Sequence, residues 1–279
     1  MKKLIPILTI FAIVSFTSCD KIEHPLQEGI TPQTGDSTVV VRRILMEEFT
    51  GHFCTACPAA AVEMERLVSV YGDQIIPIAL HAGNTTFNEP HTGAGSYETD
   101  FRTPAGNAYA TQFQPFGLPS GMVSRITNGT AIPAAQWEAE IVSLKDLEPE
   151  AEIKIETTYD DANREVTIDV ESEWLLEGDQ GAIYRLQVYI IEDHIIDWQL
   201  NNGVDIPDYD HRHVLRGAVN PIWGDVITNT TQGTIDDKTF TYTLATNWDK
   251  DNCEIVAFIY KEGPDYEVMQ ANIEPVTTH

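Results

Sequence analysis

The sequence is poor in basic residues, poor in cysteine and lacks a long apolar run. Lysine and arginine number 17 against 43 aspartate and glutamate residues, and the formal net charge is −26. A surface with this excess of negative charge repels nucleic acids and anionic lipid headgroups, so we expect neither as a partner. The N-terminal apolar stretch, Leu4 to Phe16, is too short to cross a bilayer as a helix, which takes about 20 residues.

Residues 1–18 have the pattern of a bacterial secretion signal. Two lysines precede the apolar stretch, and Thr17 and Ser18 stand directly before Cys19. Small residues before a cysteine resemble the lipobox, in which the cysteine becomes the lipidated N-terminus after cleavage. We therefore expect Cys19 to carry lipid, with an ordinary cleavage site as the alternative. Residues 19–37, rich in proline, glycine, threonine and charge, are then a flexible tether.

Cys54 and Cys57 stand between an apolar run at 39–45 and a segment with helical periodicity. A Cys-x-x-Cys at a strand-to-helix turn is the redox signature of thioredoxin-like proteins. The free N–H groups and the positive end of the helix dipole favour the thiolate of Cys54, and Cys57, one turn further on, is the resolving cysteine. Half of a zinc site or a structural disulfide has the same spacing. The remaining Cys253 lies in an apolar run and is expected to be a buried, inert thiol.

Two further segments match parts that thioredoxins place around the disulfide. Glu48, six residues before Cys54, stands where thioredoxins have a buried acid that handles the proton of the second cysteine. Glu47 is adjacent, so one of the two must point away from the core. The segment containing Leu118 and Pro119 looks like the loop that presents a cis-proline to the disulfide. Together these parts predict a thioredoxin-like domain with a cis bond before Pro119.

The period of the apolar residues changes near Pro149 and indicates two domains. Residues 38–148 alternate helical and strand-like segments, with a polar insertion at about 82–102, and predict an α/β thioredoxin-like domain. Over 149–279 apolar and polar residues alternate, and six or seven short strands without helices predict an all-β, immunoglobulin-like sandwich. The helices are expected after Pro58, at 103–113 and after Pro133, and the strands at 75–80, 122–126, 153–155, 166–170, 184–190, 240–244, 253–260 and 267–273.

Two groups of polar side chains could bind a metal ion. His211 and His213 would share one face of a strand, but the segment 208–215 offers no third ligand at a useful spacing. His52 and His81 could join the two cysteines around copper or zinc, as in thioredoxin-fold copper chaperones. Those chaperones space their cysteines one residue wider. We therefore expect no metal site and no cofactor.

Four segments, 47–58, 118–125, 189–193 and 213–216, carry a resemblance to a known family. They resemble the outer membrane protein twenty-eight family of lipoproteins from Gram-negative bacteria, and the resemblance covers nearly the whole mature chain. It implies a thioredoxin-like domain followed by a β-rich domain on a lipid anchor at the outer membrane, on its periplasmic or cell-surface face. The family is named for its location, so the resemblance implies no settled activity.

Two functions compete. In the first, the chain is a thiol–disulfide oxidoreductase: the Cys54 thiolate attacks a sulfur of an extracytoplasmic protein thiol or disulfide, and Cys57 resolves the mixed disulfide. In the second, the chain is a cell-surface binding or adhesion lipoprotein, the thioredoxin-like domain is a scaffold and the disulfide is structural. We prefer the first. The intervening Thr55 and Ala56 carry no charge that would indicate the direction of the redox chemistry.

Overall fold

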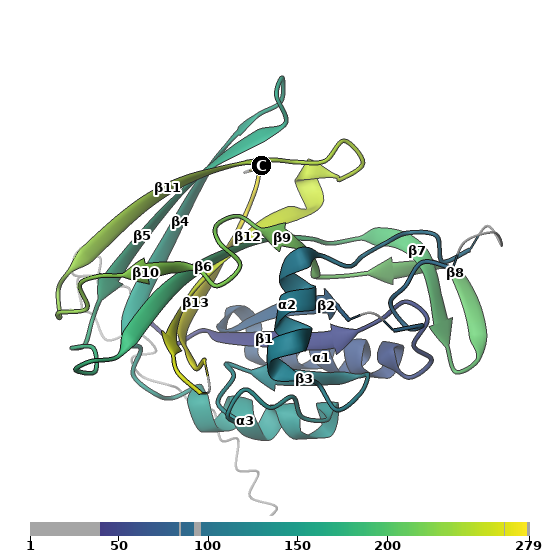
Figure 1. Cartoon of the computed structure of the whole chain (residues 1–279), viewed down its shortest axis with the longest axis horizontal. Helices are drawn as coiled ribbons and strands as arrows, with labels where there is room; N and C mark the ends of the chain where they lie inside the picture. Colours follow the sequence, from purple (N-terminus) through teal and green to yellow (C-terminus); the bar gives the residue numbers. More distant parts are fainter. Residues whose placement is uncertain (1–39, 84, 92–95, 265, 278–279) are drawn as a thin grey trace, which may run out of the picture. The chain divides into compact units, whose positions relative to one another are not determined.

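The main β-sheet collects strands from both halves of the chain (Figure 1). The computed structural model describes residues 40–83, 85–91, 96–264 and 266–277. In spatial order the strands are β13 (Val268–Pro275), β12 (Cys253–Glu262), β6 (Ile183–Glu192), β9 (Val214–Ala218), β2 (Ile75–His81), β1 (Ile44–Thr50) and β3 (Ser120–Val123), with β10 (Asp225–Ile227) beside β6. The pairs β1–β2 and β2–β9 are parallel, and the others are antiparallel.

Three α-helices lie in the described part of the N-terminal half, where the sequence predicts them. α1 (Cys57–Tyr71) begins at the second cysteine and ends at Gly72, whose positive φ of 57° suits glycine. α2 (Pro104–Phe113) starts with proline, and the Thr103 hydroxyl caps it by accepting a backbone hydrogen bond. α3 (Trp137–Leu144) follows a short 3₁₀ turn.

Both faces of β1 are covered, and all seven of its side chains are buried. α1 and α3 pack on the face that carries Ile44 and Met46, and α2 packs on the face that carries Leu45 and Phe49. β1 and β2 are parallel, so their C-terminal ends lie at one edge of the sheet. Active sites of open α/β sheets form at this edge, and here the loop with the two cysteines leaves β1.

Two smaller antiparallel sheets complete the fold. The first consists of β4 (Ala151–Asp160), β5 (Glu165–Trp174) and β11 (Ile235–Thr243), with β5 in the middle. Its apolar side chains share one core with those of β6 and β12. The second is a hairpin of β7 (Ile195–Asn201) and β8 (Val204–His211).

The strands expected after Pro149 are present, but they divide between two sheets. β6, β9, β12 and β13 continue the sheet of β1, β2 and β3, and the backbone N–H of Ala79 donates a hydrogen bond to the carbonyl oxygen of His213. The alternation of apolar and polar residues therefore predicted where the strands lie, but not which strands pair with one another. The immunoglobulin-like topology and the independent folding of 38–148 and 149–279 stay predictions.

The predicted signal at 1–18, the lipid site Cys19 and the tether at 19–37 lie outside the described residues. In the part of the chain that the structure describes, no helix combines the length and the apolar character that a membrane span requires.

Candidate functional site

Cys54 and Cys57 form a disulfide at the start of α1. Their Cα atoms are 5.4 Å apart, and Cys57 is the first residue of the helix. Ala56 at the N-cap contributes no side-chain hydrogen bond. Pro58 has no N–H group, and the N–H groups of Cys57 and Ala59 donate to the carbonyl oxygens of Cys54 (3.3 Å) and Ala56 (3.2 Å). The positive end of the helix dipole, rather than a free N–H group, therefore acts at the sulfurs. Cys54 and Cys57 are only 3% and 2% exposed.

The β7–β8 hairpin covers the loop that carries the cysteines. Donors of the hairpin hydrogen-bond the carbonyl oxygens of this loop: Gln199 Nε2 to Gly51 (3.3 Å) and Cys54 (3.1 Å), the N–H of Leu200 to His52 (2.9 Å), and the N–H of Asn202 to Thr55 (3.0 Å). The N–H of Gly203 also donates to the Thr55 hydroxyl. The hairpin therefore provides hydrogen-bond donors for the carbonyl groups of this loop, including that of Cys54.

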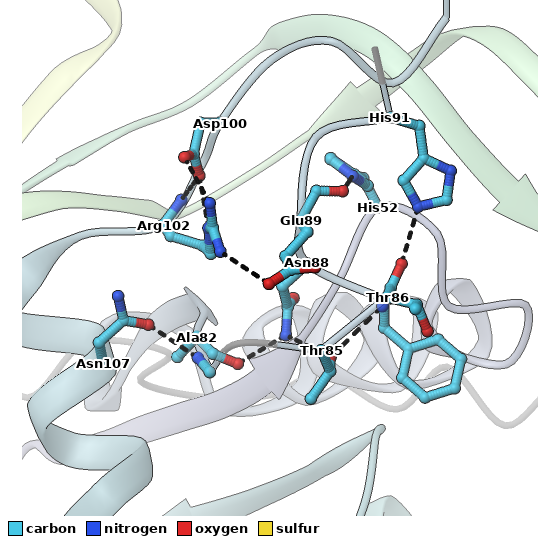
Figure 2. A network of polar contacts seen from close by, with 12 residues as sticks. His52, Ala82, Thr85, Thr86, Asn88, Glu89, His91, Asp100, Arg102 and Asn107 are labelled. Atoms are coloured by element: carbon cyan, nitrogen blue, oxygen red, sulfur yellow. Dashed lines mark hydrogen bonds and ion pairs between the residues drawn. The ribbon is translucent and has the colours of Figure 1, made fainter.

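The insertion at 82–102 contacts the same loop (Figure 2). His52 Nε2 lies 3.3 Å from the carbonyl oxygen of Glu89, and the N–H of Phe53 donates to that of Phe87. A Cβ atom added at Gly51 would lie 2.5 Å from the Phe87 oxygen, so only glycine allows this close approach. The hairpin therefore contacts Cys54 directly, and the insertion contacts its neighbours His52 and Phe53.

A cavity of about 270 Å³ lies beside Cys57, between α1, β2 and the hairpin. Cys57 and Glu48 both line it, whereas Cys54 is not among the described residues that do. Val62 of α1 also lines the cavity and is 69% exposed, so the cavity reaches the protein surface there.

Glu48 is buried at the wall of this cavity and is 3% exposed. Its Oε1 atom has no hydrogen-bond partner. Burial raises the pKa of Glu48 to about 8, although a hydrogen bond with Thr50 and the charge of His213 oppose the shift. At neutral pH the carboxyl is therefore mostly protonated and can donate a proton.

The expectation that one of Glu47 and Glu48 points away from the core is wrong. The two side chains do lie on opposite faces, but both faces of β1 are buried, and Glu47 is 1% exposed. The carboxylate of Glu47 accepts two hydrogen bonds of 2.7 Å from the buried guanidinium of Arg125. Glu48 is thus the acid on the face of α1 and the disulfide, as the predicted relay requires.

The Leu118–Pro119 peptide bond is cis, as the sequence predicts. Ser120 pairs with Phe49, so Pro119 follows next in register, level with the end of β1 from which the cysteine loop leaves. The strand expected at 122–126 is β3 (Ser120–Val123), which ends three residues earlier, and an isolated bridge joins Gly121 to Ile132.

Three of the four histidines weighed as metal ligands, His52, His81 and His211, lie around the ring of Phe101. The rings of His81 and His211 lie 5.6 Å apart and pack around Phe101. Burial lowers the pKa of His211 to about 4 and that of His81 well below its usual value. His213 does not join them, because its ring points to a different set of side chains.

His213 lies between acidic side chains, with Nε2 2.9 Å from Glu65 and Nδ1 3.1 Å from Asp193. Burial alone would lower the pKa of His213, but the hydrogen bonds with Asp193 and Glu65 raise it to about 9. Ligand atoms of Asp193, His213 and Glu254 lie within 4.8 Å of one another, a metal-like grouping within the described ranges. Both ring nitrogens of His213 already lie against carboxylates. The protonated imidazole therefore supplies the positive charge that a metal ion would bring to this group of acids.

The sequence did not identify Gln199 and Tyr209 as neighbours of the disulfide. Gln199 binds Cys54 across 145 positions of the chain, and Tyr209 lines the cavity. The hairpin makes three other contacts through backbone N–H groups, which every residue type except proline carries. The residue types of the hairpin therefore gave no signal for this contact.

Comparison with known proteins places the chain in a family. The family model described as outer membrane protein Omp28 matches residues 106–277, a region that begins after the cysteines. HBP35 of Porphyromonas gingivalis has a similar fold, with a TM-score of 0.65 and 15% identity over 85% of this chain and 76% of that chain. A domain of the outer membrane lipoprotein Omp28 from P. gingivalis is 27% identical, covering 46% of this chain and 89% of its own, with a TM-score of 0.34. No curated protein matches. Because the Omp28 model matches more than half of the chain, this protein belongs to the Omp28 family of outer membrane lipoproteins.

Proposed function

We propose that this protein is a thioredoxin-like thiol–disulfide oxidoreductase on the extracytoplasmic side of the outer membrane, with Cys54 and Cys57 as its redox pair. The observation that carries the proposal is that Cys57 and the buried carboxyl of Glu48 line the same cavity. A buried carboxyl with an unpartnered oxygen costs stability. A purely structural disulfide does not need a buried carboxyl beside it. A redox-active cysteine does, because it gains and loses a proton in each cycle.

In this proposal a different feature of the structure assists each sulfur. Cys54 precedes the first turn of α1, and the positive end of the helix dipole stabilises a thiolate there. Cys57 is inside the helix and shares the cavity with Glu48, which supplies a proton when the Cys57 thiolate forms and takes it back when the disulfide closes.

Equilibration of the protein in dithiothreitol buffers of graded potential tests this function. We expect a reduction potential above about −300 mV, because structural bridges lie below this value. The Cys253→Ser variant serves as the control, since Cys253, the free cysteine among the described residues, is buried and should not contribute. A potential below −300 mV would support the alternative of a binding or adhesion lipoprotein with a structural disulfide.

The proposal includes a lipid on Cys19 as the membrane anchor. The mature N-terminal peptide, analysed by mass spectrometry, should begin at Cys19 and carry the added mass of acyl chains. In the Cys19→Ser variant we expect neither the processing nor the added mass. An unmodified N-terminus at any other residue of the wild-type protein would contradict the assignment.

A further inference from the structure

We propose that the β7–β8 hairpin, residues 195–211, is a lid over the redox pair, and that it turns about its two ends to let a client protein reach the sulfurs. Gln199 is the residue that holds this lid closed. The inference rests on the proposed redox function and adds to it the element of the fold that controls access to both cysteines.

Neither sulfur is accessible to another protein while the hairpin lies over the cysteine loop. Cys54 is 3% exposed and Cys57 is 2% exposed. Thiol–disulfide exchange requires that the attacking thiolate reach a sulfur atom. The hairpin hydrogen-bonds the loop that carries both cysteines, and it lines the cavity shared by Cys57 and Glu48 with Gln199, Tyr209, Asp210 and His211. Movement of the hairpin would therefore uncover the loop and open the cavity together.

The hairpin is weakly integrated into the rest of the fold. Its two strands pair with each other and with no other strand of the described residues. None of its residues belongs to the three clusters of buried apolar side chains found in the described ranges. Gln199 and His211 are buried, and the other hairpin residues are half-buried or exposed. Segments with so few buried apolar contacts open at a lower free energy than the core.

Both ends of the hairpin have the backbone of a hinge. His194, directly before β7, has a φ of 56°, and His213, between β8 and β9, has a φ of 54°. Hinges are commonly a few residues at the ends of elements. Beyond the second hinge the chain is anchored: His213 Nε2 lies 2.9 Å from Glu65 of α1, and its carbonyl oxygen accepts a hydrogen bond from Ala79 of β2. The base of the hairpin therefore stays in place while its tip moves.

Gln199 joins the hairpin to the cysteine loop through one amide group. Its Nε2 atom donates to the carbonyl oxygens of Gly51 (3.3 Å) and Cys54 (3.1 Å) in the loop and of Leu200 (2.9 Å) in the hairpin. Without this amide the loop oxygens lose a donor in the closed state, whereas water can bind them when the lid is open. Loss of the amide therefore favours the open state.

The insertion at 82–102 holds the lid from a second side. The Tyr97 hydroxyl donates to Asp205 Oδ1 (2.7 Å), and the Thr99 hydroxyl donates to Asp197. The ring of Tyr97 also lies 5.9 Å from that of Trp198. Asp205 is exposed, so water can replace its hydrogen bond when the lid opens.

Hydrogen exchange of the oxidised wild-type protein, followed by NMR, tests whether the hairpin opens by itself. The N–H groups of Leu200, Asn202 and Gly203 bond to the cysteine loop and exchange only when the lid leaves it. We expect similar protection at these three amides, lower by about 100-fold or more than at the amides of β1. Protection as high as that of β1 would show that the hairpin opens only with the whole protein, and would overturn the inference.

The variant Gln199→Ala tests the link between the lid and the redox reaction. Reduction by dithiothreitol and reoxidation by its oxidised form should both become about tenfold faster, because each direction requires the open lid. The reduction potential should stay the same, since the two rates rise together. Unchanged rates would overturn the inference. Faster reduction without faster reoxidation would also overturn it, because Gln199 would then stabilise the disulfide itself.

Gln270→Ala is the matched control for this variant. Gln270 is as buried as Gln199, at 3% exposure, and its amide bonds to residues 41 and 43, which precede β1. This variant should keep the wild-type rates in both directions. An equal acceleration in the two glutamine variants would show a general loss of stability rather than the opening of a lid, and would overturn the inference.

Tyr97→Phe loosens the lid without touching a hydrogen bond of the cysteine loop. It removes the bond to Asp205 and keeps the ring, so both rates should rise by about threefold. A change in one direction alone would count against the lid. The exchange of the three hairpin amides does not involve the sulfurs. A reduction potential in the range of structural bridges would therefore remove the redox function, while the exchange rates would still decide whether the hairpin opens.

Discussion

The substitution Glu47→Gln is expected to lower the free energy of unfolding by about 3–5 kcal/mol, since it leaves the charge of Arg125 buried without a counter-ion. Glu47 and Arg125 are each 1% exposed and are joined by two hydrogen bonds of 2.7 Å. Glutamine keeps the size of the side chain and one acceptor oxygen, so the main loss is the negative charge.

The surroundings of Arg125 offer no replacement carboxylate among the contacts described. Its guanidinium lies 5.0–5.7 Å from the ring centroids of four aromatic residues, Tyr109, Phe113, Phe258 and Tyr260. Rings of this kind attract a cation by about 0.5–2 kcal/mol, which is less than the cost of an unpaired buried charge.

Urea unfolding with the disulfide intact measures the loss of stability in Glu47→Gln, and two further variants serve as comparisons. The double variant Glu47→Leu with Arg125→Met removes both charges and should recover most of the lost stability, since apolar side chains can replace a buried pair. Glu63→Gln breaks the ion pair with Arg66 on the surface and should change stability far less. If Glu47→Gln had no more effect than Glu63→Gln, the pair would contribute nothing to stability.

The glutamates of β1 show how far the sequence predicts the site. Alternation along a strand correctly placed Glu47 and Glu48 on opposite faces. The error was to assume one buried face, because the residues that cover the second face, such as Tyr109 and Arg125, come from segments more than 50 positions away. The local sequence pattern therefore predicted the strand and the position of Glu48 near the disulfide. It did not predict the ion pair between Glu47 and Arg125 on the opposite face of the strand.

The β7–β8 hairpin shows a second limit of prediction from the sequence, which concerns contacts between residues far apart in the chain. The periodicity and the Cys-x-x-Cys signature predicted the helix and the disulfide, which depend on residues close in sequence. The cis bond before Pro119 was predicted only from the likeness of its segment to the corresponding loop of thioredoxins. The hairpin reaches the disulfide by long-range hydrogen bonds, and His213 finds Glu65 across 148 positions. Such contacts depend on the order of the strands in the sheet, which the alternation of apolar and polar residues does not determine. The hairpin over Cys54 and the cavity beside Cys57 could therefore be identified only from the structure.

Glu48→Gln is expected to remove a large part of the pH dependence of stability. Burial raises the pKa of Glu48 from its usual 4.5 to about 8, so the folded state holds the proton more tightly than the unfolded chain. The stability of the wild-type protein therefore falls as pH rises from about 4.5 to 8, by up to about 1.4 kcal/mol per pH unit from this group. Glutamine does not titrate and lacks this dependence.

Other buried groups titrate in the same interval, and the comparison with the variant separates them. The raised pKa of His213, about 9, stabilises the fold below its usual value near 6.5, and this contribution is lost as pH rises toward 9. The lowered pKa values of His81 and His211 act at acidic pH, where the unfolded chain binds protons that the folded protein excludes. These contributions are present in both proteins, so to a first approximation they cancel in the difference.

Urea unfolding of both proteins at pH 5, 6, 7 and 8 gives this difference directly. We expect it to be small at pH 5 and to favour the variant by on the order of 3 kcal/mol at pH 7 to 8. Parallel stability curves would show that Glu48 is not protonated in the folded protein near neutral pH. The proton beside Cys57 would then have to come from another group, and the role of Glu48 in the exchange would be lost with it.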